Sequence, residues 1–181
     1  VDYFHLNSVG VDHDGHLLVS ARNTCGVYKI HRKTGAVLWR LGGKRSDFTL
    51  GPGVAFWYQH DARRRADGTL TLFDNASSAP GPEGALGPTS RPIRLRLDMV
   101  GMTASLVEEY RGTDNRLAFA MGNLQQLEDG SAMVGWGSIG SQSELARDGT
   151  VRWDSTFQPG VASYRAYRAR WVGRPTTRPD A

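Results

Sequence analysis

The chain contains a single cysteine in 181 residues and no long apolar run. Cys25 alone can form neither an internal disulfide nor a cysteine-based metal site. No stretch approaches the ~20 apolar residues that a membrane helix needs, so we predict no integral membrane segment in this chain. The first residues, VDYFHL, show neither an initiating methionine nor a signal peptide. We therefore expect a mature or excised piece, whose start does not identify the compartment.

The chain also lacks an evenly spread excess of positive charge. Its net charge is +4, yet residues 1–146 carry as many acidic as basic side chains, and the tail from residue 147 supplies the whole excess. A nucleic-acid groove spreads its basic residues along one face. This placement argues against a nucleic-acid partner, while an apolar content of 39% excludes wholesale disorder.

Helical periodicity is weak, whereas short runs of strand-forming residues recur between Asp, Asn and Gly turns. The runs FHLNSVGVD, HLLVSAR, GVYKIHR and AVLWRLGG are typical of a four-stranded β-meander. The plan repeats twice, and the first hairpin turn of each unit ends at Gly15, Gly68 or Gly130. Repeats of this length, each giving four antiparallel strands, predict an all-β fold of the β-propeller class.

Three blades are expected at about residues 1–50, 51–113 and 114–158. Residues 159–173 are interpreted as the first strand of a fourth blade, and residues 174–181 as a polar, disordered tail. Propellers need ~4–8 blades to close. We therefore expect the chain to be part of a longer protein, with the missing blades as its partners in one ring.

The mouth of the central channel is the predicted place for chemistry. The first strand of each blade lines the channel, and its start shares a rim with the end of the antiparallel second strand. This rule places His5, Asn7 and Arg22 of blade one at the rim with His60 and Asn75 of blade two. Because Arg offers a planar fork of donors and His can act as a nucleophile or general acid, the set suits an anionic substrate.

Several segments resemble the arylsulfotransferase family, which moves sulfate between phenols without a nucleotide donor. They are FHLNSV, LLVSARN, YKIHRKTGAVLWRLGG and QHDARRRADGTLTLFDN, followed by GNLQQLEDGSAMVGWG and SYRAYRARW. The resemblance covers about residues 2–173. The motifs HxN, SxR and QHDA…DGTLTLFDN are fairly specific together, although each alone is weak.

The resemblance implies a six-bladed propeller with its active site in the central channel and no metal or other cofactor. His60 stands where the family has the histidine that becomes sulfated. His5 stands at the family's HxN histidine, and Arg22 at the arginine that holds the sulfate oxygens. The implied partners are small molecules, an aryl sulfate and a phenol. The implied location is extracytoplasmic: periplasmic, secreted or cell-surface.

Two parts of the family pattern have no single matching residue in this chain. The family's further active-site histidine lies on a blade upstream of HxN, before this chain begins. A polar contact from a late blade has two candidates here, Asn123 and Arg165. Trp57 and Tyr58, beside the QHDA motif, are candidates for stacking on the aryl ring, with core packing as the equal alternative.

The sequence leaves other interpretations open. His60, His5 and Arg22 could be hydrogen-bonded structural residues of a non-catalytic, extracellular binding scaffold. The Gly/Trp pattern of the blades also fits a quinoprotein-like oxidoreductase, which would need a calcium-binding carboxylate set that the sequence lacks. The segment DHDGH at 12–16 is interpreted as a hairpin turn and not as a metal site. Trp39, Trp136 and Trp153 are expected to pack between blades.

Overall fold

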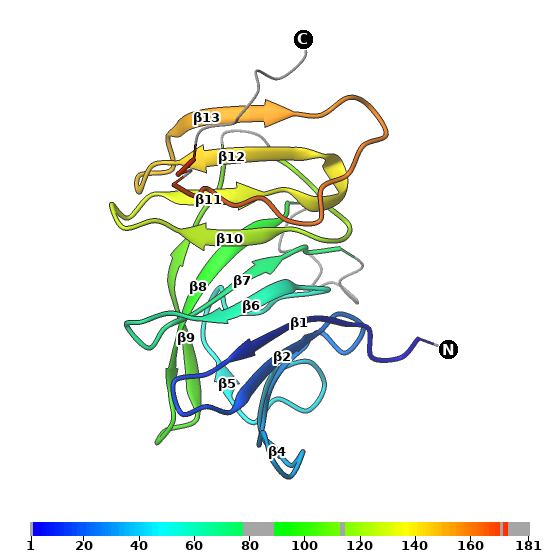
Figure 1. Cartoon of the computed structure of the whole chain (residues 1–181). Helices are drawn as coiled ribbons and strands as arrows, with labels where there is room; N and C mark the ends of the chain where they lie inside the picture. The colour runs from blue at the N-terminus through cyan, green and yellow to red at the C-terminus, as the bar shows by residue number, and fades with distance from the viewer. Residues whose placement is uncertain (1, 78–88, 113–114, 171, 174–181) are drawn as a thin grey trace.

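The structure is a computed structural model that describes residues 2–77, 89–112, 115–170 and 172–173. Its elements form three sheets, antiparallel apart from the β5–β9 pair, and in Figure 1 the sheet of β1–β4 lies at the bottom of the view and the sheet of β10–β13 at the top. The all-β prediction is confirmed, and the sheets have the four-stranded meander form of β-propeller blades. No helix in the described part of the chain is long and apolar enough to cross a bilayer.

Each blade runs from an innermost to an outermost strand in sequence order. Blade one contains β1 (Leu6–Val11), β2 (Leu17–Ala21), β3 (Gly26–Ile30) and β4 (Val37–Gly42). Blade two contains β6 (His60–Arg64), β7 (Leu70–Asp74), β8 (Arg91–Asp98) and β9 (Thr103–Glu109). Blade three contains β10 (Asn123–Gln126), β11 (Ala132–Gly135), the 3-10 turn η2 (Gly137–Ile139), β12 (Ser141–Leu145) and β13 (Val151–Thr156).

The three turn glycines that define the sequence repeat have the same backbone geometry. Gly15, Gly68 and Gly130 have φ angles of 82°, 81° and 82°, a left-handed conformation that strains other residues. In each turn the glycine N–H bonds to the carbonyl three residues earlier, at 2.9, 2.9 and 3.1 Å. The repeat that the sequence predicts is therefore present in the backbone.

Blade two carries an additional strand that the sequence pattern does not indicate. β5 (Thr49–Leu50) pairs in parallel with the outermost strand β9, with Thr49 opposite Thr103. The chain leaves blade one at its outer edge and must return to the inner strand of blade two. β5 is the place where this connection lies against the edge of the sheet.

Two apolar clusters hold the blades face to face. The first lies between blades one and two and includes Leu18, Leu41 and Leu72. The second lies between blades two and three, where the rings of Phe73 and Trp136 meet edge to face with centroids 5.9 Å apart. Complete burial of these side chains supplies the main attraction between the sheets.

Polar bonds from the first two strands of each unit, or from the residue directly after them, join that unit to the backbone of the segment that follows. The Asn7 amide donates to the Gln59 carbonyl at 2.8 Å, and the Asn75 amide donates to the Ala118 carbonyl at 2.8 Å. The Asn123 amide forms two bonds with the backbone of Ala166, at 2.7 and 2.8 Å. These three asparagines are buried, so their bonds form in a low-dielectric interior.

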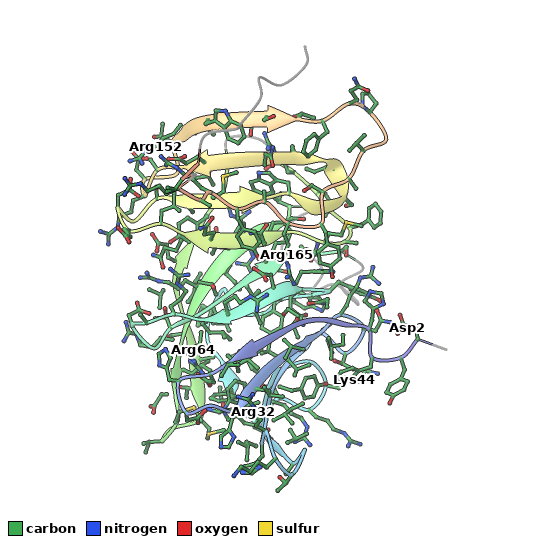
Figure 2. The ribbon with its side chains drawn as sticks, in the orientation of Figure 1. Asp2, Arg32, Lys44, Arg64, Arg152 and Arg165 are labelled. Atoms are coloured by element: carbon green, nitrogen blue, oxygen red, sulfur yellow. The ribbon has the colours of Figure 1, made fainter. Side chains whose placement is uncertain are left out.

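Buried ion pairs also connect neighbouring blades. Asp12 of blade one receives two bonds from Arg64 of blade two, at 2.9 and 3.2 Å, and a third contact from Lys29 at 2.8 Å. Arg64 lies at the junction of the two sheets in Figure 2. The Asp12 carboxylate of DHDGH is thus bound by structural partners. The segment forms the predicted hairpin between β1 and β2.

The segment after β13 forms no regular strand over residues 159–170. It lies along β10, where the side-chain amides of Asn123 and Gln125 bond to the backbone of Ala166 and Arg168. Trp153 does not pack between blades as expected: it is 45% exposed on β13, which no other sheet of the described residues covers. The predicted tail at 174–181 lies outside the described residues.

Candidate functional site

His60 begins β6 and lies at the junction of blades two and three. A β-bulge separates His60 from Arg63 in the β6–β7 pairing, and bulges of this kind redirect side chains at functional sites. The His60 Nδ1 atom lies 2.7 Å from Asn75 Oδ1 and 3.0 Å from the Tyr58 carbonyl oxygen. Its Nε2 accepts a bond from the Met121 N–H at 3.2 Å.

The partners of the imidazole determine its tautomer. The Asn75 amide nitrogen donates to the carbonyls of Ala118 and Met121, which leaves Oδ1 facing His60. Oxygen acceptors at Nδ1 and an N–H donor at Nε2 assign the proton to Nδ1 and the lone pair to Nε2. Asn75 is therefore a positioning residue for His60, with both ends of its amide bonded to protein.

His60 is neutral at physiological pH. The side chain is 2% exposed, and burial lowers its pKa from the ordinary 6.5 to about 4. The bonds to Asn75 and Tyr58 oppose this effect, while the nearby charges of Arg22 and His5 add to it. A neutral imidazole with a lone pair on Nε2 is the form in which histidine acts as a nucleophile.

Arg22 follows β2 and spans from blade one toward blade three. Its guanidinium carbon lies 4.3 Å from the centroid of the Tyr58 ring. Its Nη atoms donate to the Asn23 side chain at 3.2 Å and to the Phe119 carbonyl at 3.4 Å. Among the described residues its buried Nε has no hydrogen-bond partner. An unpaired buried N–H of a cation can donate a hydrogen bond to an oxyanion at low cost.

His5 precedes β1 and is exposed. Its backbone carbonyl accepts the Arg22 N–H at 2.9 Å, which ties the start of the first strand to the end of the second as the rim rule predicts. Its imidazole Nδ1 contacts the Asp2 carboxylate. No direct contact joins the His5 and His60 rings among the described residues, but the two are close enough to influence each other electrostatically.

The remaining predicted residues serve different partners. Asn7 is buried and bonds to the Gln59 carbonyl, while its Oδ1 has no partner among the described residues. Asn123 commits both ends of its amide to Ala166. The Trp57 backbone N–H bonds to the Asp74 carboxylate, and its half-buried ring lines a pocket.

Two tyrosines contact His60: Tyr58, which the sequence already indicates as a neighbour of the rim, and Tyr164, which sequence reasoning missed. The Tyr164 ring meets the His60 ring edge to face, with centroids 6.4 Å apart. Tyr58 provides both the carbonyl that accepts from His60 and the ring beneath Arg22. Tyr58 is adjacent to the QHDA motif, whereas nothing in the sequence indicates that Tyr164 returns to the same place.

Arg165 also reaches the site. Its Nη2 donates to the Asn7 carbonyl at 3.0 Å, and its Nε lies 3.3 Å from the buried Asp61 carboxylate. In Figure 2 it lies between the second and third sheets. Arg165 is thus joined to blades one and two by polar contacts, whereas Asn123, the other late-blade candidate, is bonded to Ala166.

Backbone strain concentrates around this site. Left-handed φ angles occur at His5 (52°), Tyr58 (53°), Asp61 (55°), Ala76 (53°) and Met121 (66°). Non-glycine residues rarely adopt this conformation, and such strain clusters at functional sites. Each of these residues contacts His60, Arg22 or Arg165, or adjoins Asn75.

The described residues contain no group of three or more His, Cys, Asp or Glu side chains arranged to hold a metal ion.

A comparison with known families and structures adds independent findings. A family model described as arylsulfotransferase (ASST) matches residues 1–158. None of the curated proteins compared with the chain matches it.

Solved structures with a similar arrangement include a protein of unknown function from Bacteroides caccae, with 15% identity and a TM-score of 0.49 over 86% of this chain and 47% of that one. PQQ-bound aldose sugar dehydrogenase from Streptomyces coelicolor has 15% identity and a TM-score of 0.47 over 81% of this chain and 46% of that one. Virginiamycin B lyase from Staphylococcus aureus has 11% identity and a TM-score of 0.45 over 88% and 58%. The chain spans about half the length of these proteins.

Proposed function

We propose that this chain, which belongs to the arylsulfotransferase family, carries the sulfuryl-accepting part of an active site that moves sulfate from an aryl sulfate to a phenol. The observation that carries the proposal is the neutral His60, whose Nε2 lone pair is oriented by Asn75 and Tyr58 beside the Arg22 cation. The family match supplies the substrate class.

In the first step, the His60 Nε2 lone pair attacks the sulfur of the aryl sulfate. The N–S bond forms while the S–O bond to the aryl group breaks, and the aryl oxygen leaves with the electron pair. Arg22 neutralises charge on the sulfate oxygens through Nε and its Nη groups. His5 protonates the departing aryl oxygen, which leaves as a phenol.

The sulfated imidazole retains its Nδ1–H, and the bonds to Asn75 Oδ1 and the Tyr58 carbonyl stabilise its positive charge. In the second step the oxygen of an acceptor phenol attacks the sulfur, the N–S bond breaks, and the phenol proton passes to His5. The Met121 N–H must release Nε2 for either step to occur. This exchange is a ping-pong mechanism that uses only protein side chains.

The proposal extends to the rest of the protein. Blades that complete the propeller would supply the family's further histidine, and an extracytoplasmic location would give access to exogenous phenols. Because the chain spans about half the length of the similar structures, we would test it beside any longer reading frame that contains it.

Intact-protein mass spectrometry after brief exposure to 4-nitrophenyl sulfate tests the proposal. We expect a gain of one sulfuryl group that disappears when phenol is added. His60→Gln should abolish the gain, Arg22→Gln should slow it by about 10²–10³-fold, and the control His13→Gln, exposed in the turn between β1 and β2, should leave it unchanged.

A gain in the longer protein alone would show that this chain is an incomplete site. The absence of a gain in both proteins, with the longer one folded, would overturn the transferase proposal and favour a binding scaffold.

A further inference from the structure

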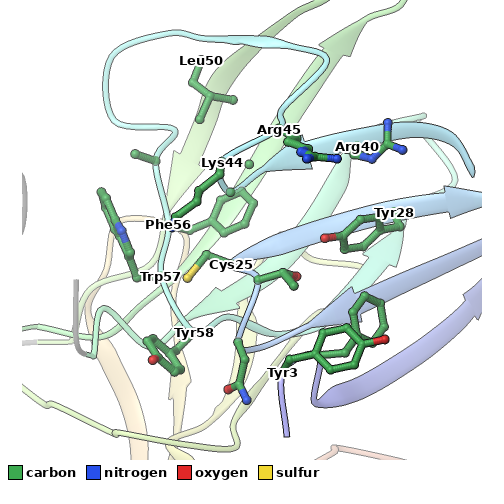
Figure 3. Close-up of a pocket in the computed structure, with 16 residues that line it drawn as sticks. Tyr3, Cys25, Tyr28, Arg40, Lys44, Arg45, Leu50, Phe56, Trp57 and Tyr58 are labelled. Atoms are coloured by element: carbon green, nitrogen blue, oxygen red, sulfur yellow. The ribbon is translucent and has the colours of Figure 1, made fainter. Parts of the chain in front are cut away.

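A pocket of about 1080 Å³ opens on blade one beside the site (Figure 3). Aromatic side chains form much of its wall: Tyr3, Phe4, Tyr28, Phe56, Trp57 and Tyr58. Figure 3 shows the rings of Phe56, Trp57 and Tyr58 along one side and those of Tyr3 and Tyr28 along another, with Cys25 between them. Walls of this kind bind flat, apolar rings by stacking and edge contacts.

The rim of the pocket is positively charged. Arg40, Lys44 and Arg45 line it, and its described lining contains no carboxylate side chain. Arg40 has a partner, since its Nη1 lies 3.5 Å from the Asp47 carboxylate. Lys44 and Arg45 are exposed and form no ion pair within the described ranges. Uncompensated cations beside aromatic walls favour a ligand that is both aromatic and anionic.

The pocket is built into the fold. Gly42 and Gly43 have φ angles of 78° and 66°, and a Cβ on Gly42 would lie 2.6 Å from the Phe56 ring. The Ser46 hydroxyl accepts the Gly42 N–H at 3.2 Å and donates to the Phe48 carbonyl at 2.8 Å. These bonds fix the loop that carries Lys44 and Arg45.

Two of the residues that line the pocket contact Arg22 directly. The Tyr58 ring lies beneath its guanidinium, and the Asn23 side chain accepts a bond from its Nη1. Both Tyr58 and Asn23 line the pocket. A ring bound in the pocket is therefore separated from the proposed sulfate-binding arginine by a single layer of side chains.

We propose that this pocket is a binding site for an aromatic anion, with the ring against Phe56, Trp57 and Tyr58 and the anionic group at Lys44 and Arg45. The choice of an aryl sulfate as ligand rests on the proposed function. The site holds the aryl sulfate near the reaction centre without reacting with it.

Cys25 gives a site-specific readout because it is the only cysteine of the chain and lines the pocket. Burial raises the pKa of its thiol, so alkylation by N-ethylmaleimide at a fixed, mildly alkaline pH is expected to be slow and measurable. Saturating 4-nitrophenyl sulfate should slow the alkylation several-fold. Phenol alone and inorganic sulfate alone should protect less, since each meets only part of the site.

The double variant Lys44→Gln, Arg45→Gln should weaken protection by about tenfold. The matched control Arg32→Gln, Lys33→Gln removes the same charge from an exposed turn outside the pocket and should leave protection unchanged. Protection that is absent, or equal in both double variants, would overturn the proposal.

His60→Gln separates the two proposals. We expect this variant to be protected by the aryl sulfate although it accepts no sulfuryl group. Protection of the wild-type chain without sulfuryl transfer to any length of the protein would refute the proposed function alone. Transfer without protection of Cys25 would refute the pocket proposal alone.

Discussion

At the scale of single residues, burial of His60 without a charged partner makes the stability of the fold depend on pH. The folded-state pKa of about 4 lies below the ordinary 6.5, so the folded protein binds fewer protons than the unfolded chain between these values. This contribution to the free energy of unfolding is present at neutral pH and is lost as the pH falls from about 6.5 to 4. The whole loss is about 3 kcal/mol.

The comparison of wild type with His60→Gln isolates this contribution, because the carboxylates titrate in both proteins. We expect urea unfolding to show that the wild type loses about 2–3 kcal/mol more than the variant between about pH 7 and pH 4. Equal losses in the two proteins would show that His60 is not buried as a neutral group.

The residue types of the site could be predicted from the sequence, but not their partners. The rim rule groups His5, Arg22 and His60, and the electrostatic influence of Arg22 and His5 on His60 agrees with that grouping. The bond from the Met121 N–H to His60 was unpredictable because any residue supplies a backbone amide. The sequence also could not show that the Asn123 amide is bonded to Ala166, because an asparagine uses the same groups to join segments of the chain and to bind a ligand.

At the scale of elements, the end of β4 depends on glycine for two separate reasons. Gly42 has a left-handed φ, and a Cβ there would also lie 2.8 Å from the Cys25 carbonyl oxygen and 2.6 Å from the Phe56 ring. Gly35, in the turn before β4, has a similar φ of 74° but has nothing within 4 Å of its Cβ position.

A comparison of Gly35 with Gly42 separates the cost of backbone strain from the cost of a steric clash. We expect Gly35→Ala to cost about 1 kcal/mol of unfolding free energy from the backbone conformation alone. Gly42→Ala should cost about 3 kcal/mol or more, because the added methyl displaces Phe56 and the neighbouring backbone. Denaturant midpoints of the two variants measure the difference, and similar costs would contradict the close packing of Phe56 and the Cys25 backbone around Gly42.

At the scale of the whole molecule, the sheets are held in order by charged joints as well as by apolar packing. Arg64→Met should cost about 3 kcal/mol, because it leaves the buried Asp12 carboxylate with Lys29 as its remaining charged partner. The control Arg152→Met removes an exposed pair with Asp129 and should cost under about 1 kcal/mol. Thermal unfolding of both variants provides the test, and equal shifts would contradict a structural role for the Arg64 joint.

The order of strands and the blade repeat followed from the sequence because hairpin turns leave a local signature. Gly15, Gly68 and Gly130 mark equivalent turns, and the two strands that each turn joins pair antiparallel as predicted. β5 left no such signature, since two residues are too few to show a period. The path of the segment around Tyr164 and Arg165 depends on contacts with residues more than 100 positions earlier, which local patterns do not encode.

The joints made by Asn7, Asn75 and Asn123 have a consequence for how such a molecule can evolve. Across each joint, the asparagine bonds to backbone carbonyl or N–H groups of the next segment, and its bonds there do not depend on a particular side chain. A neighbouring unit can therefore change its side chains without losing the bond. Duplication of one unit copies the donor and finds an acceptor already present in any recipient, so a gene for a ring of such units can lengthen by whole copies.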